Sequence, residues 1–203
     1  MTEHVLLRSG RLSLVLGGSL TAVFWLIALA LGTFVGADVV RSPLWMPAQL
    51  AHVSGALLSL LGITTLFLAH RSRFGPSAPA VFFLAFLGLS MFLIDGGIAL
   101  TVFPALATAA PDMLGLTGAM NGPPMLYAYI AFSALAMIGL AAFAILLLRA
   151  QIGPRSASIL MLCGAVVSNL PPGPVPLRLI AVGGLVWGVG AAWHGLRLRE
   201  PAA

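Results

Sequence analysis

Charged residues are scarce in this chain of 203 residues: Asp, Glu, Lys and Arg make up 7% of it, whereas 60% is hydrophobic. A soluble domain usually carries about a quarter charged residues. Five acids and ten bases cannot cover the surface of such a protein in water, but they can cover the two ends of a helix bundle in a bilayer. The composition therefore excludes a water-soluble fold and predicts a membrane protein.

Lysine is absent, so all ten basic residues are arginine, and a Schiff base with retinal or pyridoxal phosphate is excluded. The single cysteine, Cys163, excludes an intrachain disulfide, a CxxC redox pair and a site of several thiolates. Enzyme motifs such as HExxH, paired acidic residues and Gly-x-Ser-x-Gly are also absent. We therefore expect a protein that is not an enzyme, with no catalytic residues, no cofactor and no metal site.

Six apolar stretches follow one another along the chain. They are Leu12 to Gly36, Ala48 to Ala69, Pro79 to Phe103, Met125 to Leu148, Ala157 to Leu170 and Leu177 to Leu196. A spanning helix needs about 20 apolar residues. Five of the stretches are long enough, and the fifth is too short. Two interpretations stay open for the fifth: a full span, which we prefer, or a helical hairpin with the sixth that crosses the membrane only in part. The first stretch is longer than the core of a secretory signal, so we expect it to be an uncleaved helix.

The distribution of arginine predicts the orientation. With the N-terminus in the cytoplasm, the outer side carries only Arg41 and Arg178. The inner side carries eight arginines, Arg8, Arg11, Arg71, Arg73, Arg149, Arg155, Arg197 and Arg199. This positive-inside bias also explains the pI of 11.1 without a nucleic-acid partner. We predict an all-α fold: a single domain over residues 1–203 that forms a bundle of six transmembrane helices with both termini cytoplasmic.

Asp95 is the residue that most needs explaining, because it lies inside the third stretch, eight residues before Phe103. That spacing puts it roughly 12 Å below the outer end of a helix. A carboxylate at this depth costs about 2.5 to 3.5 kcal/mol, so it must be protonated, paired or hydrated. Two interpretations stay open: a proton or cation site in a translocation path, or a buried pair that fixes helix packing.

Other polar residues of the membrane zone fall in the same outer half, whereas the inner halves are almost purely apolar. They are Gln49, His52, Tyr127, Tyr129, Asn169 and Arg178. We predict that these six residues and Asp95 form a polar pocket that opens to the outside. A channel through the membrane would show polar residues along its whole length.

Histidine and tryptophan have ordinary explanations in this sequence. A membrane histidine can relay protons or hold haem, but His52 is expected to be interfacial or bonded to Asp95. His70 and His194 lie at the inner ends of two stretches and can be paired as haem ligands. We prefer the interpretation that both are interfacial residues beside arginine. Trp45 is expected in the aromatic belt at the membrane surface.

Small residues recur four positions apart and predict close helix packing, because lipid-embedded helices associate through van der Waals fit. The sets are Gly32 and Gly36; Ala51, Gly55 and Ser59; Gly164 and Ser168; and Gly184 and Gly188. We expect packing within one bundle, surrounded by the lipid bilayer. A homo-oligomer or a larger membrane complex is the alternative.

The C-terminal part of the chain carries a resemblance. Asn-Leu-Pro-Pro-Gly-Pro-Val-Pro from Asn169 to Pro176 precedes Gly-Gly-Leu-Val-Trp-Gly-Val-Gly from Gly183 to Gly190 and a basic tail. This ending resembles small uncharacterised bacterial multi-pass membrane proteins, a likeness that implies no activity. We expect a protein of the bacterial plasma (inner) membrane. Its function is expected to be non-catalytic, as an accessory subunit or small-ligand binder; the alternative is a small proton- or cation-coupled transporter that uses Asp95.

Overall fold

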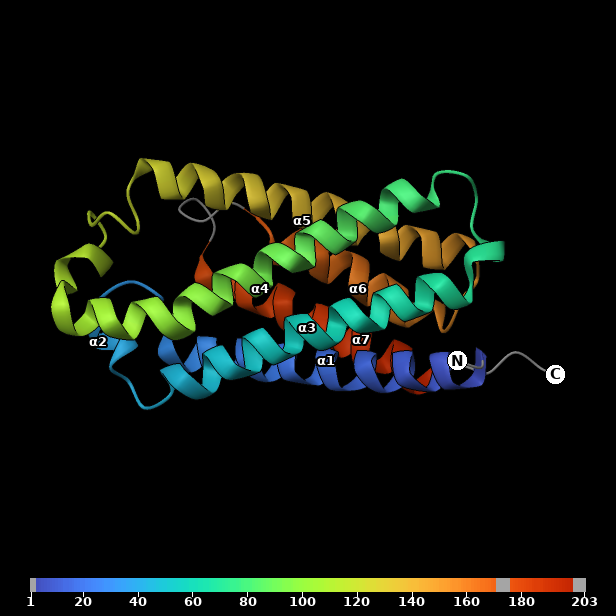
Figure 1. Ribbon diagram of the computed structural model, residues 1–203, viewed down its shortest axis with the longest axis horizontal. Helices are drawn as coiled ribbons and strands as arrows, with labels where there is room; N and C mark the ends of the chain where they lie inside the picture. Colours follow the sequence, from blue (N-terminus) through green and yellow to red (C-terminus); the bar gives the residue numbers. More distant parts are fainter. Residues whose placement is uncertain (1–2, 171–175, 199–203) are drawn as a thin grey trace.

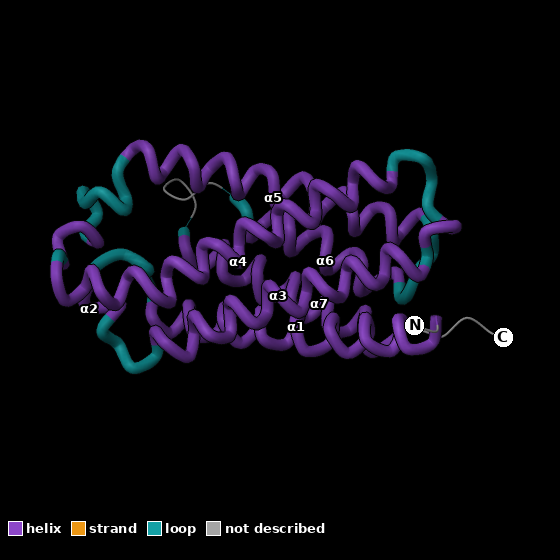
Figure 2. Tube along the Cα trace, in the orientation of Figure 1, coloured by secondary structure: helices purple, strands orange, loops and turns teal. Residues whose placement is uncertain are grey.

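Helices account for the regular structure of the described residues, 3–170 and 176–198, in a computed structural model of the chain (Figure 2). The α-helices are α1 (Glu3–Leu31), α2 (Ala37–Val40), α3 (Trp45–Ala69), α4 (Ala78–Ala109), α5 (Pro123–Arg149), α6 (Arg155–Ser168) and α7 (Leu177–Arg197). Two short 3-10 helices are η1 (Arg71–Arg73) and η2 (Pro111–Leu114). No strand occurs in these ranges, so the predicted all-α class is confirmed.

Five helices, α1, α3, α4, α5 and α7, are long and apolar enough to cross a membrane. This is the architecture of a multi-pass membrane protein. The sixth, α6, has 14 residues and is therefore only about 21 Å long, whereas the hydrocarbon core of a bilayer is about 30 Å thick. Figure 1 shows that α6 runs along only part of the bundle.

The six helices of 14 or more residues, called the long helices below, form a closed ring. Each packs against its neighbours in the order α1, α3, α4, α5, α6 and α7, and α7 returns to α1. The first and last helices run antiparallel, because Gly188 lies against Gly18 while Gly195 lies against the carbonyl of Arg11. The start of α1 and the end of α7 consequently lie at the same end of the bundle (Figure 1).

Most of the predicted small-residue contacts occur between helices of this one chain. A Cβ at Gly55 would lie 3.0 Å from the backbone nitrogen of Thr21, and one at Gly184 would overlap the indole of Trp25. Gly32 and Gly36 are different, because a Cβ at either would meet no atom within 4 Å. With φ values of 73° and 104°, they are turn residues after the end of α1 and not packing residues, so the predicted end of the first helix at Gly36 is wrong.

The predicted end of the third stretch at Phe103 is also wrong, because α4 continues through Pro104 to Ala109. Proline removes one helical hydrogen bond, but tertiary contacts hold the extra turns in place. Ala107 packs in a cluster with residues of α2 and η2, and the guanidinium of Arg41 donates to the carbonyl of Ala107. Asp95 therefore lies 14 residues before the end of the helix, which corresponds to about 21 Å.

Candidate functional site

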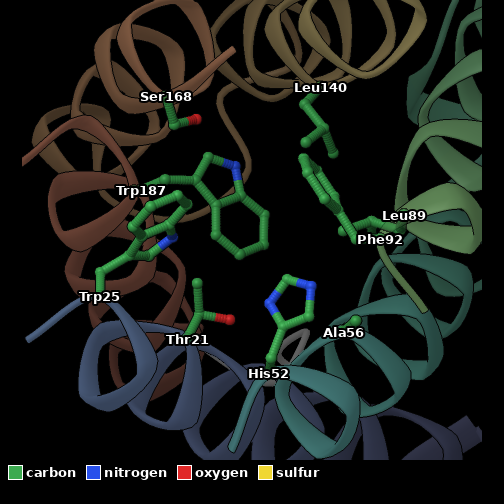
Figure 3. Close-up of a pocket in the computed structure, with 10 residues that line it drawn as sticks. Thr21, Trp25, His52, Ala56, Leu89, Phe92, Leu140, Ser168 and Trp187 are labelled. Atoms are coloured by element: carbon green, nitrogen blue, oxygen red, sulfur yellow. The ribbon is translucent and has the colours of Figure 1, made fainter. Parts of the chain in front are cut away.

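A cavity lies inside the helix ring, and all six long helices line it (Figure 3). The lining residues are Thr21, Trp25, His52, Ala56, Leu89, Phe92, Leu140, Ser168, Gly184 and Trp187. The cavity leaves about 40 Å³ for the centres of water-sized molecules, whereas one water needs roughly 10–15 Å³. Most of the lining is apolar or aromatic, so the few polar atoms decide what it can bind. We call it the central cavity.

His52 brings an imidazole into the central cavity from α3. It lies seven residues after Trp45, the first residue of the helix, which is about 10 Å along its axis. The ring packs between Phe24, at 4.3 Å between ring centroids, and Phe92, at 6.1 Å. A Cβ at Gly96 would overlap the imidazole, so glycine there makes room for it. The imidazole lies close to the backbone of Phe92, but its Nε2 atom is buried and meets no group with hydrogen-bonding geometry among the described residues.

Trp187 borders the same cavity from α7. Its indole is 5% exposed, and the backbone of α7 at this position packs against Gly164 of α6. The Nε1 atom is buried without a hydrogen-bond partner in the described part of the chain, and an indole nitrogen can only donate. An unsatisfied buried polar group costs about 1–3 kcal/mol, which a molecule in the cavity would recover.

The two hydroxyl groups of the central cavity already have partners. The hydroxyl of Thr21 donates to the carbonyl of Gly17 at 2.9 Å. The Ser168 hydroxyl accepts from the side-chain amide of Asn169 at 3.1 Å. Among the described residues that line the cavity, His52 Nε2 and Trp187 Nε1 are the buried side-chain atoms without a hydrogen-bond partner.

Asp95 belongs to a second, smaller hollow, between α4 and α5. Its lining comprises Gly88, Met91, Phe92, Asp95, Tyr129, Phe132, Ser133 and Ala136. We call this second hollow the Asp95 groove. Phe92 lines both the groove and the central cavity, so it lies between them. Asp95 and Tyr129 are exposed at the flank of the bundle. Tyr129 faces both Asp95 and Ser133.

The predicted polar residues are therefore not gathered in one pocket. His52 lines the central cavity, while Asp95 and Tyr129 line the groove. The other four, Gln49, Tyr127, Asn169 and Arg178, line neither. Gln49 and Asn169 are buried, whereas Tyr127 and Arg178 are exposed.

The sequence interpretation missed Thr21, Trp25 and Trp187 as cavity residues. For Trp187 a signal was available: it lies ten residues after the start of α7 and ten before its end, whereas interfacial tryptophans lie near helix ends. Trp45 gives the opposite correction. It is 1% exposed, and its indole N–H donates to the carbonyl of Ala99 at 3.0 Å, so it is a core residue and not a belt residue.

His70 and His194 are buried by other parts of the chain, at 6% and 0% exposure; that they lie at the depth of the membrane interface stays a prediction. The Nδ1 atom of His194 lies 3.4 Å from the hydroxyl of Ser158. Gly153, with φ of 71°, passes close to the imidazole of His194. Within the described ranges, no three residues among His, Cys, Asp and Glu are grouped so that they could hold a metal ion.

Of the protein-family models, curated proteins and solved structures, none matches the chain. The resemblance of the C-terminal part to small bacterial multi-pass proteins stays a prediction. What the protein does must therefore be argued from the two hollows themselves.

Proposed function

We propose that all six long helices cross the plasma membrane of a bacterium, with both termini in the cytoplasm. The antiparallel contact of α1 and α7 favours an even number of crossings. The charges support the orientation: Arg73 of η1 donates to the carbonyl of Ala150 at 2.8 Å, which ties together two connections that carry arginines. Arg199 lies outside the described residues. A short α6 is accommodated by local thinning of the bilayer.

Within this bundle, the protein is a non-catalytic binder of a small molecule, which it holds in the central cavity. One observation carries the proposal: among the described residues, the His52 Nε2 and Trp187 Nε1 atoms are both buried without hydrogen-bond partners, and both residues line this cavity. The ligand presents a hydrogen-bond acceptor to Trp187, because an indole can only donate. It presents a donor or an acceptor to His52, and its remaining surface is apolar to match the lining.

The proposal is tested by what co-purifies with the protein. Wild type and the double variant His52→Leu/Trp187→Phe are purified in mild detergent from their native membranes, and bound small molecules are quantified by mass spectrometry. Each lost hydrogen bond is worth about 1 kcal/mol, so we expect the double variant to retain at least about tenfold less of one compound.

Trp193→Phe is the matched control, because Trp193 lies on the same helix, is 37% exposed and does not line the cavity. This variant is expected to retain as much of the compound as wild type. If wild type carries no small molecule, or if the double variant carries an equal amount, the binding function is refuted.

A further inference from the structure

Three oxygen-bearing side chains from two helices, α4 and α5, line the Asp95 groove. Asp95 lies near the middle of α4, 17 residues after Ala78 and 14 before Ala109. Tyr129 and Ser133 lie four residues apart on α5, so they share one face of that helix. Tyr129 lines the groove together with Asp95 and Ser133. A carboxylate, a phenol and an alcohol therefore line one small groove.

Within the part of the chain that the structure describes, the Asp95 carboxylate forms no ion pair with a basic side chain. An unpaired carboxylate within a membrane span costs several kcal/mol. Because Asp95 and Tyr129 are exposed on the flank of the bundle, the charge would face lipid unless something neutralises it.

We infer that the Asp95 groove is a binding site for one singly charged cation, either a proton or an alkali-metal ion. One positive charge makes the site neutral, whereas a divalent ion would leave a net charge of +1 in a medium of low dielectric constant. Oxygen ligands also suit hard cations and not soft transition metals. Asp95 provides the charge, and the oxygens of Tyr129 and Ser133 complete the site. This inference does not depend on the ligand of the central cavity.

The surroundings contain few other groups that could titrate with Asp95. Tyr129 is the titratable group that faces it from α5. On α3, His52 packs against Phe92 and Gly96, residues on the side of α4 that faces the central cavity. Arg41 contacts α4 at Ala107, and η2, which includes Asp112, packs near the same end.

The experiment uses the full chain in lipid nanodiscs, with Asp95→Asn as the isosteric neutral variant. Thermal unfolding is measured in NaCl, KCl and choline chloride of equal ionic strength, because a bound ion stabilises the folded state in proportion to the logarithm of its concentration. Infrared difference spectra record the band of a protonated carboxyl group as the pH is raised.

Two results support the inference and distinguish the two cations. Stabilisation by Na⁺ or K⁺ relative to choline that Asp95→Asn abolishes identifies an alkali-metal ion. A protonated-carboxyl band that disappears in Asp95→Asn and at alkaline pH, without an effect of alkali ions, identifies a proton. In either case Tyr129→Phe is expected to change the signal. It lowers the affinity for an alkali-metal ion about tenfold, or it shifts the band of the protonated carboxyl group.

The controls are Asp112→Asn, which removes an exposed acid of η2, and Tyr127→Phe, which removes an exposed tyrosine two residues closer to the start of α5. Both are expected to behave as wild type. The inference is overturned if wild type shows neither signal, if either signal persists in Asp95→Asn, or if Tyr129→Phe leaves it unchanged.

Discussion

At the scale of single residues, structural side chains differ from candidate functional ones in whether their buried polar atoms have hydrogen-bond partners. Trp45 and Trp187 are both buried indoles, at 1% and 5% exposure. The N–H of Trp45 donates to the carbonyl of Ala99, whereas that of Trp187 has no partner in the described residues. Trp45 is therefore a structural link between α3 and α4, whereas the N–H of Trp187 is left for the ligand that we propose.

Replacement of Trp45 by phenylalanine tests its structural role. The substitution removes the hydrogen bond to Ala99 and part of a buried ring, so we expect the free energy of unfolding to fall by about 1–2 kcal/mol. Reversible unfolding in mixed detergent micelles measures this loss. Trp193→Phe, at an exposed position of α7, should change the same quantity by less than about 0.5 kcal/mol; equal losses would contradict a specific role for Trp45.

Polarity in the sequence identified some site residues and not others. Asp95 and His52 stand out because a charged or polar side chain within an apolar stretch needs a physical explanation. Their assignment to different hollows depends on which way α3 and α4 face, and the sequence around them is apolar on every side. The burial of His194 was not predictable for a related reason: nothing in the sequence around it indicates that the connection at Gly153 passes close to its imidazole and covers it.

At the scale of helices, glycine determines where the backbones approach each other. Gly88 and Gly97 lie on the same helix, α4, and differ in their surroundings. A Cβ at Gly88 would lie 2.6 Å from the Cα of Ala136 on α5, whereas a Cβ at Gly97 would meet no atom within 4 Å. The contact between α4 and α5, which also forms the Asp95 groove, therefore depends on glycine at only one of these two positions.

Alanine substitution at the two glycines should have opposite effects on stability. Gly88→Ala forces α4 and α5 apart, and such overpacking typically costs about 1–3 kcal/mol. Gly97→Ala adds a methyl group in open space, and alanine favours a helix by up to about 1 kcal/mol over glycine. Thermal unfolding of both variants in nanodiscs measures the difference. An equal loss of stability in the two would disprove this account of the packing.

Helix existence was predictable from the sequence, but helix ends were not. Five apolar stretches are long enough to indicate spans by themselves. The extension of α4 through Pro104 depends on contacts with α2 and η2, which are distant in sequence and leave no local pattern. Conversely, Gly32 fits a small-residue packing pattern but stops α1, because its φ of 73° is a conformation that favours glycine.

At the scale of the whole molecule, the closed ring explains why a cavity exists in so small a bundle. Six helices arranged around one axis leave space in the middle that only large side chains can fill. Here His52, Trp25 and Trp187 point into this space without closing it (Figure 3). Because α6 ends at Ser168, which itself lines the cavity, no further turn of α6 fills this space.

The proposed orientation is testable with single cysteines, because Cys163 is the only native one. In a Cys163→Ser background, Leu116→Cys and Ser72→Cys place thiols at exposed positions in the connections that follow and precede α4. A membrane-impermeant maleimide should label Leu116→Cys in intact cells and Ser72→Cys only after permeabilisation. The reverse pattern would invert the topology, and labelling of both in intact cells would contradict a six-span bundle.

The length of α4 has a consequence for the lipid around the protein. Its 32 residues extend about 48 Å, more than the roughly 40–45 Å of a whole bilayer with its headgroups, while α6 covers about half of that length. A surrounding bilayer of uniform thickness cannot match the lengths of both helices. The phospholipids are therefore expected to be compressed beside α6, and the last turns of α4, fixed by Arg41, to stand in the headgroup layer as a rigid rim.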